Sequence, residues 1–350
     1  MNRQRIHSFC LALMALAILV RLAGQVQFLL AWQKEQTPTL WRVDVEGAIP
    51  VPLVHTTDVP ASAAVPDRPP EQTPSSEVSA GQAVSEADIP AEPEREPVTF
   101  SPEEAGAIAV SGSCSYTFDK TALLTKPTAL DFSTDGPKVL IVHTHASEAY
   151  TQEAGYEYEP SGELRTQDET RSVIRVGSEI ARILEDAGIE TIHDTTPNDY
   201  PSYDGAYARM EAIIDAYLAE YPSIQIVLDV HRDAVEDRSG FPAALTANID
   251  GEDCARLMFV VGTDEGGLEH PNWQENLANA LKLQALLNRI SPGLCRDIDL
   301  RTERFNQHER PGSMLLEFGA SGNTLSQALR TARRFSDALA AFINGVPKNS

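Results

Sequence analysis

The chain has 350 residues and a formal net charge of −23 at pH 7, with 51 acidic against 28 basic residues. Binding to nucleic acid needs a basic surface, so this charge argues against a nucleic-acid partner. The four cysteines, Cys10, Cys114, Cys254 and Cys295, form no C-x-x-C pair. Their scatter argues against a disulfide framework or a cysteine zinc site, although a bond between Cys254 and Cys295 stays open.

An apolar segment near the amino terminus predicts a membrane anchor. Residues 9–30 are mostly apolar and long enough to span a bilayer as a helix. Arg3 and Arg5 precede this segment, and the positive-inside rule then leaves residues 1–8 in the cytoplasm and exports the rest. Because no convincing small-x-small cleavage site follows, we expect one uncleaved signal anchor rather than a cleaved signal peptide.

Residues 31–136 are expected to form a juxtamembrane segment and a linker. From about Pro50 to Pro97 the chain is rich in Pro, Ala, Ser, Glu and Thr and contains no aromatic residue. Such a segment cannot bury enough apolar surface to offset its chain entropy, so we predict an extended, disordered tether. Residues 101–135 show no clear pattern.

From Pro137 onward, strand and helix patterns alternate, which predicts one domain over residues 137–346. Apolar runs predict strands at 139–144, 189–192, 224–230, 257–261 and 313–316. Apolar residues at helical spacing predict helices at 170–187, 207–218 and 273–290, and a last helix that Asn323 caps. This alternation indicates an α/β fold, a mostly parallel sheet with helices on both faces.

Polar side chains follow three of these strands directly. His145, His231 and Glu317 each come at the carboxyl end of an apolar run, and parallel strands bring those ends to one edge of the sheet. Imidazole and carboxylate are preferred zinc ligands, and a catalytic zinc site needs about three of them. We therefore expect His145 and His231 to bind zinc with a carboxylate as third ligand, and Glu317 to transfer protons.

Other residues and other catalytic classes carry weaker signals. His143 lies two residues before His145, and we interpret it as a core residue or one that supports the ligands. The sequence has no G-x-S-x-G nucleophile elbow and no Gly-rich phosphate loop. A metal-dependent hydrolase remains the favoured class.

Several motifs resemble the stage II sporulation protein P family over residues 137–345. They are HTHASEAY at 143–150, RVG at 175–177, DVHRD at 229–233, NQ at 306–307 and LEFG at 316–319, followed by Asn323. The resemblance implies a zinc-dependent N-acetylmuramoyl-L-alanine amidase, which cuts the amide between muramic acid and the stem peptide of peptidoglycan. It also implies endopeptidase activity, a role in septal wall thinning and engulfment during sporulation, and two partners: a sporulation lytic transglycosylase and a membrane scaffold protein.

The resemblance also assigns roles to residues. His145 and His231 take the two histidine positions of a His-Glu-His zinc set, and Glu317 takes the catalytic position. We choose Glu148 as the third ligand, with Asp168 or Glu169 as the alternative. We expect Arg232, Asp233, Asn306 and Gln307 to orient ligands or bind the peptide stem. The alternative function is a membrane-anchored module that binds peptidoglycan without cutting it.

Overall fold

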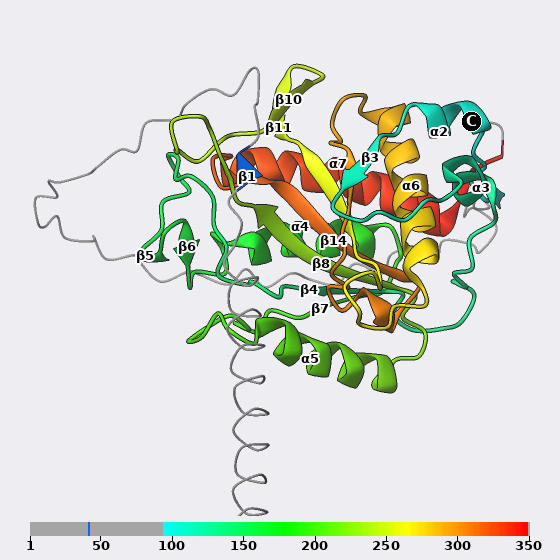
Figure 1. Cartoon of the computed structure of the whole chain (residues 1–350), viewed down its shortest axis with the longest axis horizontal. Helices are drawn as coiled ribbons and strands as arrows, with labels where there is room; N and C mark the ends of the chain where they lie inside the picture. The colour runs from blue at the N-terminus through cyan, green and yellow to red at the C-terminus, as the bar shows by residue number, and fades with distance from the viewer. Residues whose placement is uncertain (1–40, 43–93, 349–350) are drawn as a thin grey trace, which may run out of the picture. The chain divides into compact units, whose positions relative to one another are not determined.

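The computed structural model describes residues 41–42 and 94–348 (Figure 1). The chain divides into two compact units, Met1–Val43 and Asp44–Ser350. In the first unit the described part is the two-residue strand β1 (Trp41–Arg42). The predicted anchor at 9–30 and the linker up to residue 93 lie outside the described residues. Within the described part of the chain, no helix is both long and apolar enough to cross a membrane.

A seven-stranded sheet forms the centre of the second unit. Its order is β3-β13-β12-β14-β8-β4-β7. The strands are β3 (Val110–Gly112), β4 (Val139–Val142), β7 (Thr191–His193), β8 (Ile226–Asp233), β12 (Leu257–Val261), β13 (Ile298–Leu300) and β14 (Gly312–Ala320). β12 and β14 are antiparallel, and every other neighbouring pair in this sheet is parallel. The predicted mostly parallel α/β sheet is thus confirmed.

Helices cover both faces of this sheet (Figure 1). Val139 and Ile141 of β4 enter a large core together with residues of α4 (Val173–Asp186), α6 (Trp273–Ile290) and α7 (Leu325–Asn344). Leu140 and Val142 of the same strand instead pack in a smaller cluster under α5 (Ala206–Glu220). A strand buried on both faces needs apolar side chains at every position, which explains the uninterrupted apolar run.

The three strands that carry the predicted site lie side by side. β14, β8 and β4 are consecutive and parallel, so their carboxyl ends meet at one edge. β8 and β14 extend further than the apolar runs indicated, because they pair with each other along almost their whole length. His231 and Glu317 therefore lie within strands, whereas His145 lies in the loop after β4.

The segment before residue 137 contributes to the same domain. It contains β2 (Arg95–Glu96), α2 (Pro102–Gly106) and α3 (Lys120–Thr125), and its strand β3 pairs with β13 in the main sheet. Leu123, Leu124 and Ile108 are buried in the large core. The boundary predicted at residue 137 therefore moves toward the amino terminus. These elements are short and each buries few residues, so the sequence shows no hydrophobic periodicity from which they could be predicted.

The start of the last helix differs from the sequence prediction. Thr324 is the cap: its hydroxyl accepts a hydrogen bond from the Gln327 N–H. The side chain of Asn323 is already engaged, since its oxygen accepts from the N–H groups of Ala320 and Leu245. The prediction that Asn323 caps this helix is therefore wrong, and its side chain instead fixes the turn that follows β14.

Short elements complete the described part of the chain. They are β5 (Pro160–Gly162), β6 (Arg165–Thr166), β9 (Val235–Glu236), β10 (Thr246–Ile249), β11 (Glu252–Ala255), β15 (Val346–Pro347) and the 3₁₀ helix η2 (Gln307–Glu309). β15 pairs with β2 and so joins the two ends of the domain. Cys114, Cys254 and Cys295 are free thiols, so the bond left open between the last two is not formed.

Candidate metal centre

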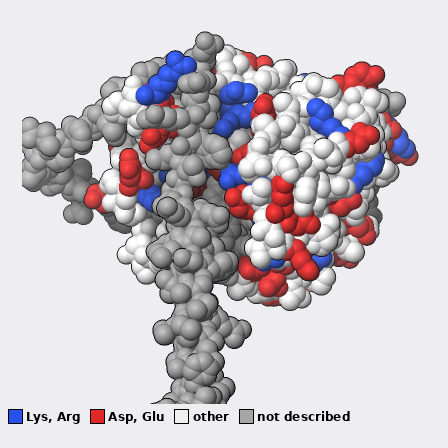
Figure 2. Space-filling model, viewed as in Figure 1, with Lys and Arg blue, Asp and Glu red and all other residues white. Residues whose placement is uncertain are grey.

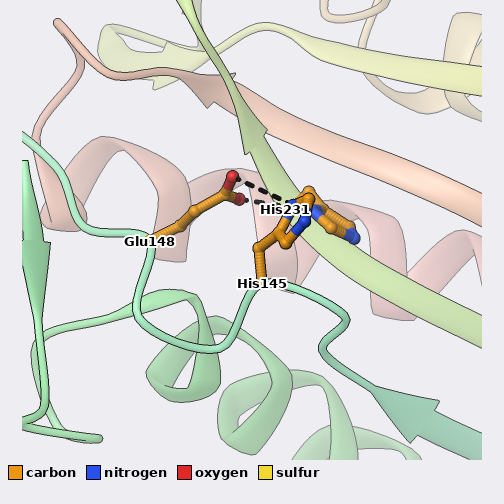
Figure 3. A group of neighbouring side chains, drawn as sticks. All are labelled: His145, Glu148 and His231. Atoms are coloured by element: carbon orange, nitrogen blue, oxygen red, sulfur yellow. Dashed lines mark ion pairs between the residues drawn. The ribbon is translucent and has the colours of Figure 1, made fainter. Parts of the chain in front are cut away.

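His145, Glu148 and His231 come together at the carboxyl edge of β4 and β8 (Figure 3). One potential ligand atom from each lies within 4.8 Å of the others. The Glu148 carboxylate faces both imidazoles, with Oε1 3.6 Å from Nδ1 of His145 and Oε2 3.3 Å from Nδ1 of His231. The two rings are 5.1 Å apart and nearly perpendicular. All three residues are at least nine-tenths buried.

A network of short hydrogen bonds fixes the loop that carries His145 and Glu148. The loop turns sharply, with the Glu148 N–H donating to the His145 carbonyl at 3.1 Å. Ser147 donates its N–H and its hydroxyl to the Asp199 carboxylate at 3.1 and 2.6 Å. The Glu148 carbonyl accepts from Val173, the first residue of α4, at 2.8 Å. The start of a helix therefore sets the position of the carboxylate ligand.

Asp229 contacts the ring nitrogen of His231 that does not face Glu148. Its Oδ1 lies 2.8 Å from Nε2 of His231. The same carboxylate accepts from the N–H and the hydroxyl of Thr144, at 2.8 and 2.6 Å. A carboxylate on the second nitrogen of a ligating histidine fixes the ring and makes it a stronger ligand. Sequence reasoning missed this role, although the spacing Asp-x-His on a strand places both side chains on one face.

The electrostatics of the group suit a cation. Burial lowers the pKa of His145 to about 4, so its ring is neutral at pH 7. Burial also opposes the charging of His231, but Asp229 and Glu148 outweigh it and raise the pKa of His231 well above its usual value. Although burial acts in the other direction, Arg232 and His231 hold the pKa of Glu148 well below its usual range.

These protonation states indicate how the residues would receive a metal ion. His145 and Glu148 are already deprotonated at neutral pH, and His231 carries the one proton that an ion must displace. Two imidazole nitrogens and one carboxylate oxygen form the donor set of catalytic zinc sites with an open position. The residues present therefore fit a zinc ion.

Glu317 lies beside this group without belonging to it. In the parallel ladder it is the register partner of His231. Its Oε2 is buried, and within the described residues it has no hydrogen-bond partner. Burial, together with the nearby Asp233 carboxylate, raises the pKa of Glu317 well above its usual range. A carboxyl group whose pKa is raised toward neutral pH is suited to proton transfer.

Aromatic and basic side chains form the open side of the centre. Tyr203 stacks on His145 with ring centroids 4.4 Å apart, and 46% of Tyr203 is exposed. Tyr207 on α5 contacts the same imidazole edge-on at 5.6 Å. Arg165 lies over the Tyr203 ring, and its Nη2 is 3.8 Å from Oε1 of Glu148. Arg165 comes from the two-residue strand β6, Tyr203 from a loop and Tyr207 from α5, and none of them lies in a motif that sequence analysis could identify.

His143 and Arg232 occupy supporting positions. His143 is fully buried, with Nδ1 2.9 Å from the Val230 carbonyl and Nε2 2.9 Å from Nε2 of His193. Burial lowers its pKa to about 3. Arg232 donates from its guanidinium to the carbonyls of Ala149 and Leu164. Its backbone N–H donates to Oε2 of Glu148 at 3.2 Å, so Arg232 holds the loop that carries the ligands.

Three other predicted residues have partners in the fold. Asp233 forms an ion pair with Arg296 at 2.7 Å. Asn306 donates to the Tyr207 carbonyl at 2.8 Å and so links the segment before η2 to α5. The amide of Gln307 accepts from Gly262 and donates to the Val260 carbonyl, which fixes the end of β12.

The two alternative third ligands lie elsewhere. Asp168 and Glu169 are exposed in the turn before α4. The Asp168 carboxylate accepts from the N–H and hydroxyl of Thr170. The structure therefore groups Glu148, and neither of these two, with the histidines.

The fold and the site define an α/β protein with a buried His-Glu-His centre at the carboxyl edge of its sheet. The sequence model of the family described as stage II sporulation protein P matches residues 57–340, which is more than half of the chain. The chain belongs to this family.

One curated relative agrees with this assignment. It is the stage II sporulation protein P of Bacillus subtilis (strain 168), which is 28% identical over 214 residues. The match covers 58% of this chain and 50% of the relative, so the chain spans about half the length of that protein.

Proposed function

We propose that this chain is a zinc-dependent peptidoglycan hydrolase of sporulation. Its reaction would be that of an N-acetylmuramoyl-L-alanine amidase, cutting the amide between N-acetylmuramic acid and the L-alanine of the stem peptide. The observation that carries the proposal is the buried His145–Glu148–His231 group with the Glu317 carboxyl group beside it. Membership of the sporulation family supports a role in septal wall thinning and engulfment.

In this proposal His145, Glu148 and His231 hold the zinc ion, and Asp229 orients His231. A divalent cation with an open position lowers the pKa of a water molecule and polarises a carbonyl oxygen. The ion would also lower the pKa of Glu317, because a nearby positive charge favours the ionised carboxylate. Glu317 can then take a proton as readily as it gives one.

Glu317 carries the proton transfer. As a carboxylate it removes a proton from the water that attacks the lactyl carbonyl carbon, and as an acid it delivers that proton to the leaving nitrogen of L-alanine. Its Oε2 is buried, and its register with His231 keeps it beside the proposed zinc ligands. The same residues could cleave peptide cross-links, which would be an endopeptidase activity.

Arg165 is the better placed of the two arginines to stabilise the negative charge on the carbonyl oxygen. Arg232 is buried and donates from Nε and Nη2 to the carbonyls of Ala149 and Leu164, whereas Arg165 donates from Nη1 to Asp199 and Ser147 and keeps Nη2 toward the centre. Arg165 is partly exposed and reaches to within 3.8 Å of Glu148. Its stacking on the exposed Tyr203 would also place that aromatic ring against the substrate.

We further propose that residues 9–30 anchor the chain in a membrane, with residues 1–8 in the cytoplasm and the catalytic domain outside it. This arrangement would bring the centre to peptidoglycan. The proposed protein partners are a sporulation lytic transglycosylase and a membrane scaffold protein.

Replacement of Glu317 by Gln tests the proposal. This change removes the proton carrier and keeps the shape of the side chain, so it should lower peptidoglycan hydrolysis at least ~100-fold while bound zinc stays unchanged. The matched control is Glu275→Gln, on α6, which removes a carboxylate that pairs with Lys126. Binding of peptidoglycan without cleavage by the unaltered protein would instead support the non-catalytic binding module.

A further inference from the structure

A second group of potential ligands lies at the junction of α5 and η2. Glu211 comes from the first half of α5, and His308 and Glu309 come from η2. Nε2 of His308 lies 2.7 Å from Oε1 of Glu309 and 3.3 Å from Oε1 of Glu211. Atoms from all three lie within 4.8 Å of one another. Ligands that bind one ion at about 2.0–2.2 Å each have such mutual spacings.

Unpartnered histidine nitrogens adjoin this group. Nδ1 of His308 is buried, and within the described residues it has no hydrogen-bond partner. The same holds for both ring nitrogens of His270, which is 0% exposed and whose ring lies edge-on to that of His308 at 6.5 Å. A buried polar atom without a partner destabilises the folded state. Two neighbouring imidazoles in this condition point to a ligand that the protein chain does not supply.

The charges around the group also favour a cation. Asp215, one turn after Glu211 on α5, contacts Glu309, so three carboxyl groups gather here. Arg304 forms an ion pair with Oε1 of Glu211 at 2.7 Å. One guanidinium does not balance three carboxylates. Figure 2 shows acidic side chains gathered over the region of α5, and such a surface raises the local concentration of cations.

We propose that Glu211, His308 and Glu309 form a second site for a divalent cation of the zinc class, separate from the His145–Glu148–His231 centre. The ring of His270 adjoins this second site. The ion would bind the carboxylate of Glu211 on α5 and the imidazole and carboxylate of His308 and Glu309 on η2. It would thereby join η2 to α5.

A cation at this second site would also stabilise the position of Tyr207 beside the first centre. Tyr207 lies one turn before Glu211 on α5, and its ring contacts His145. The carbonyl of Tyr207 accepts from Asn306, the residue before η2. A cation that fixes η2 on α5 therefore also fixes the position of this tyrosine. The role is structural, and it requires no step of the reaction.

Zinc stoichiometry of the full-length chain in detergent tests the proposal, with Zn²⁺ as the probe. We expect two equivalents for the unaltered protein and one for His231→Ala, which disables the first centre. The double variant His308→Ala/Glu309→Gln should also bind one, and its combination with His231→Ala none. Glu303→Gln, an exposed carboxylate before η2 that pairs with Arg301, is the matched control and should keep two.

Two results would overturn the proposal: a His231→Ala protein without zinc, or a double variant with unchanged stoichiometry. In either case the group at α5 and η2 is only an ion-pair network. If the double variant folds poorly, the thermal midpoint of His231→Ala gives an independent answer. Added Zn²⁺ should raise that midpoint with concentration, because an ion that binds only the folded state stabilises it. Unchanged zinc stoichiometry with no hydrolysis would count against the proposed function and leave this second site intact.

Discussion

Replacement of Asp229 by Asn isolates the contribution of a residue that would never touch the metal. Asp229 lies 2.8 Å from Nε2 of His231 and is held by two hydrogen bonds from Thr144. An asparagine has the same size, and its oxygen can still accept from the Thr144 N–H. The substitution therefore removes the negative charge behind His231 while the loop stays in place.

The size of the effect follows from the charges involved. An imidazolium and a carboxylate about 4 Å apart attract by roughly 4 kcal/mol at an effective dielectric constant of about 20, and the cost of burying both groups cancels part of this. Loss of a carboxylate behind a ligating histidine typically weakens metal binding about 10- to 100-fold. That range corresponds to about 1.4–2.7 kcal/mol. We expect Asp229→Asn to lower the affinity for zinc by a factor within this range.

The effect should depend on pH, with a definite sign. Asp229 raises the pKa of His231, so in the unaltered protein a proton competes with zinc below that raised value. In the Asp229→Asn variant the pKa of His231 is no longer raised, and the affinity for zinc is lower as well. The ratio of zinc affinities between the two proteins should therefore be largest at high pH and should shrink as the pH falls.

Competition with a chromophoric chelator at pH 6 and at pH 8 measures this ratio. The matched control is Asp253→Asn, an exposed carboxylate on the β10–β11 hairpin, which should leave the affinity unchanged. An affinity within twofold of the unaltered protein at pH 8, with the fold intact, would refute the role of Asp229. A ratio that grows toward low pH would refute the stated proton competition.

Three further predictions concern packing, protons and the choice of ligand. Gly177→Ala should lower the free energy of unfolding by about 1–3 kcal/mol, since its Cβ would come within 2.7 Å of the imidazoles of His143 and His193. Gly106→Ala, where a Cβ meets nothing within 4 Å, should not, and chemical denaturation measures both. Zinc binding at pH 6 should release at least one proton, the one on His231, in calorimetry across buffers of different ionisation enthalpy, and zero would contradict the assigned charge states. Glu148→Gln should lose zinc from this centre and Asp168→Asn should keep it; metal analysis of the two variants decides, and the reverse result would restore the alternative ligand.

The main sheet could be predicted because β4, β8 and β12 are buried on both faces, which leaves an uninterrupted apolar run in the sequence. The convergence of His145, His231 and Glu317 followed from the shared edge of parallel strands. That reasoning worked because β4, β8 and β14 are adjacent and parallel. The same reasoning would have failed for residues at the carboxyl end of β12, because β12 is antiparallel to β14 and ends at the opposite edge of the sheet.

The remainder depends on contacts that sequence spacing does not encode. Tyr203 and Asp199 approach the centre from loops and Arg165 from the two-residue strand β6, where no periodicity fixes the direction of a side chain. Asp229 is the exception, since strand alternation already placed it on the same face as His231. The elements between residues 94 and 136 are short, so their fit to the core becomes visible only once the sheet exists.

Gln307 shows that a motif position does not reveal a role. Its amide is used on the backbone of Gly262 and Val260 and holds the end of β12. The sequence could not distinguish this structural use from contact with a substrate, because both favour a side chain that donates and accepts hydrogen bonds.

The most direct test of the central claim is digestion of peptidoglycan by the zinc-loaded protein in ¹⁸O-labelled water, with mass spectrometry of the products. The account predicts one ¹⁸O atom in the lactyl carboxylate of muramic acid, a free amino group on L-alanine, and loss of both products in Glu317→Gln. An intact muramic acid–alanine bond in every product, or full activity after removal of zinc by a chelator, would contradict it.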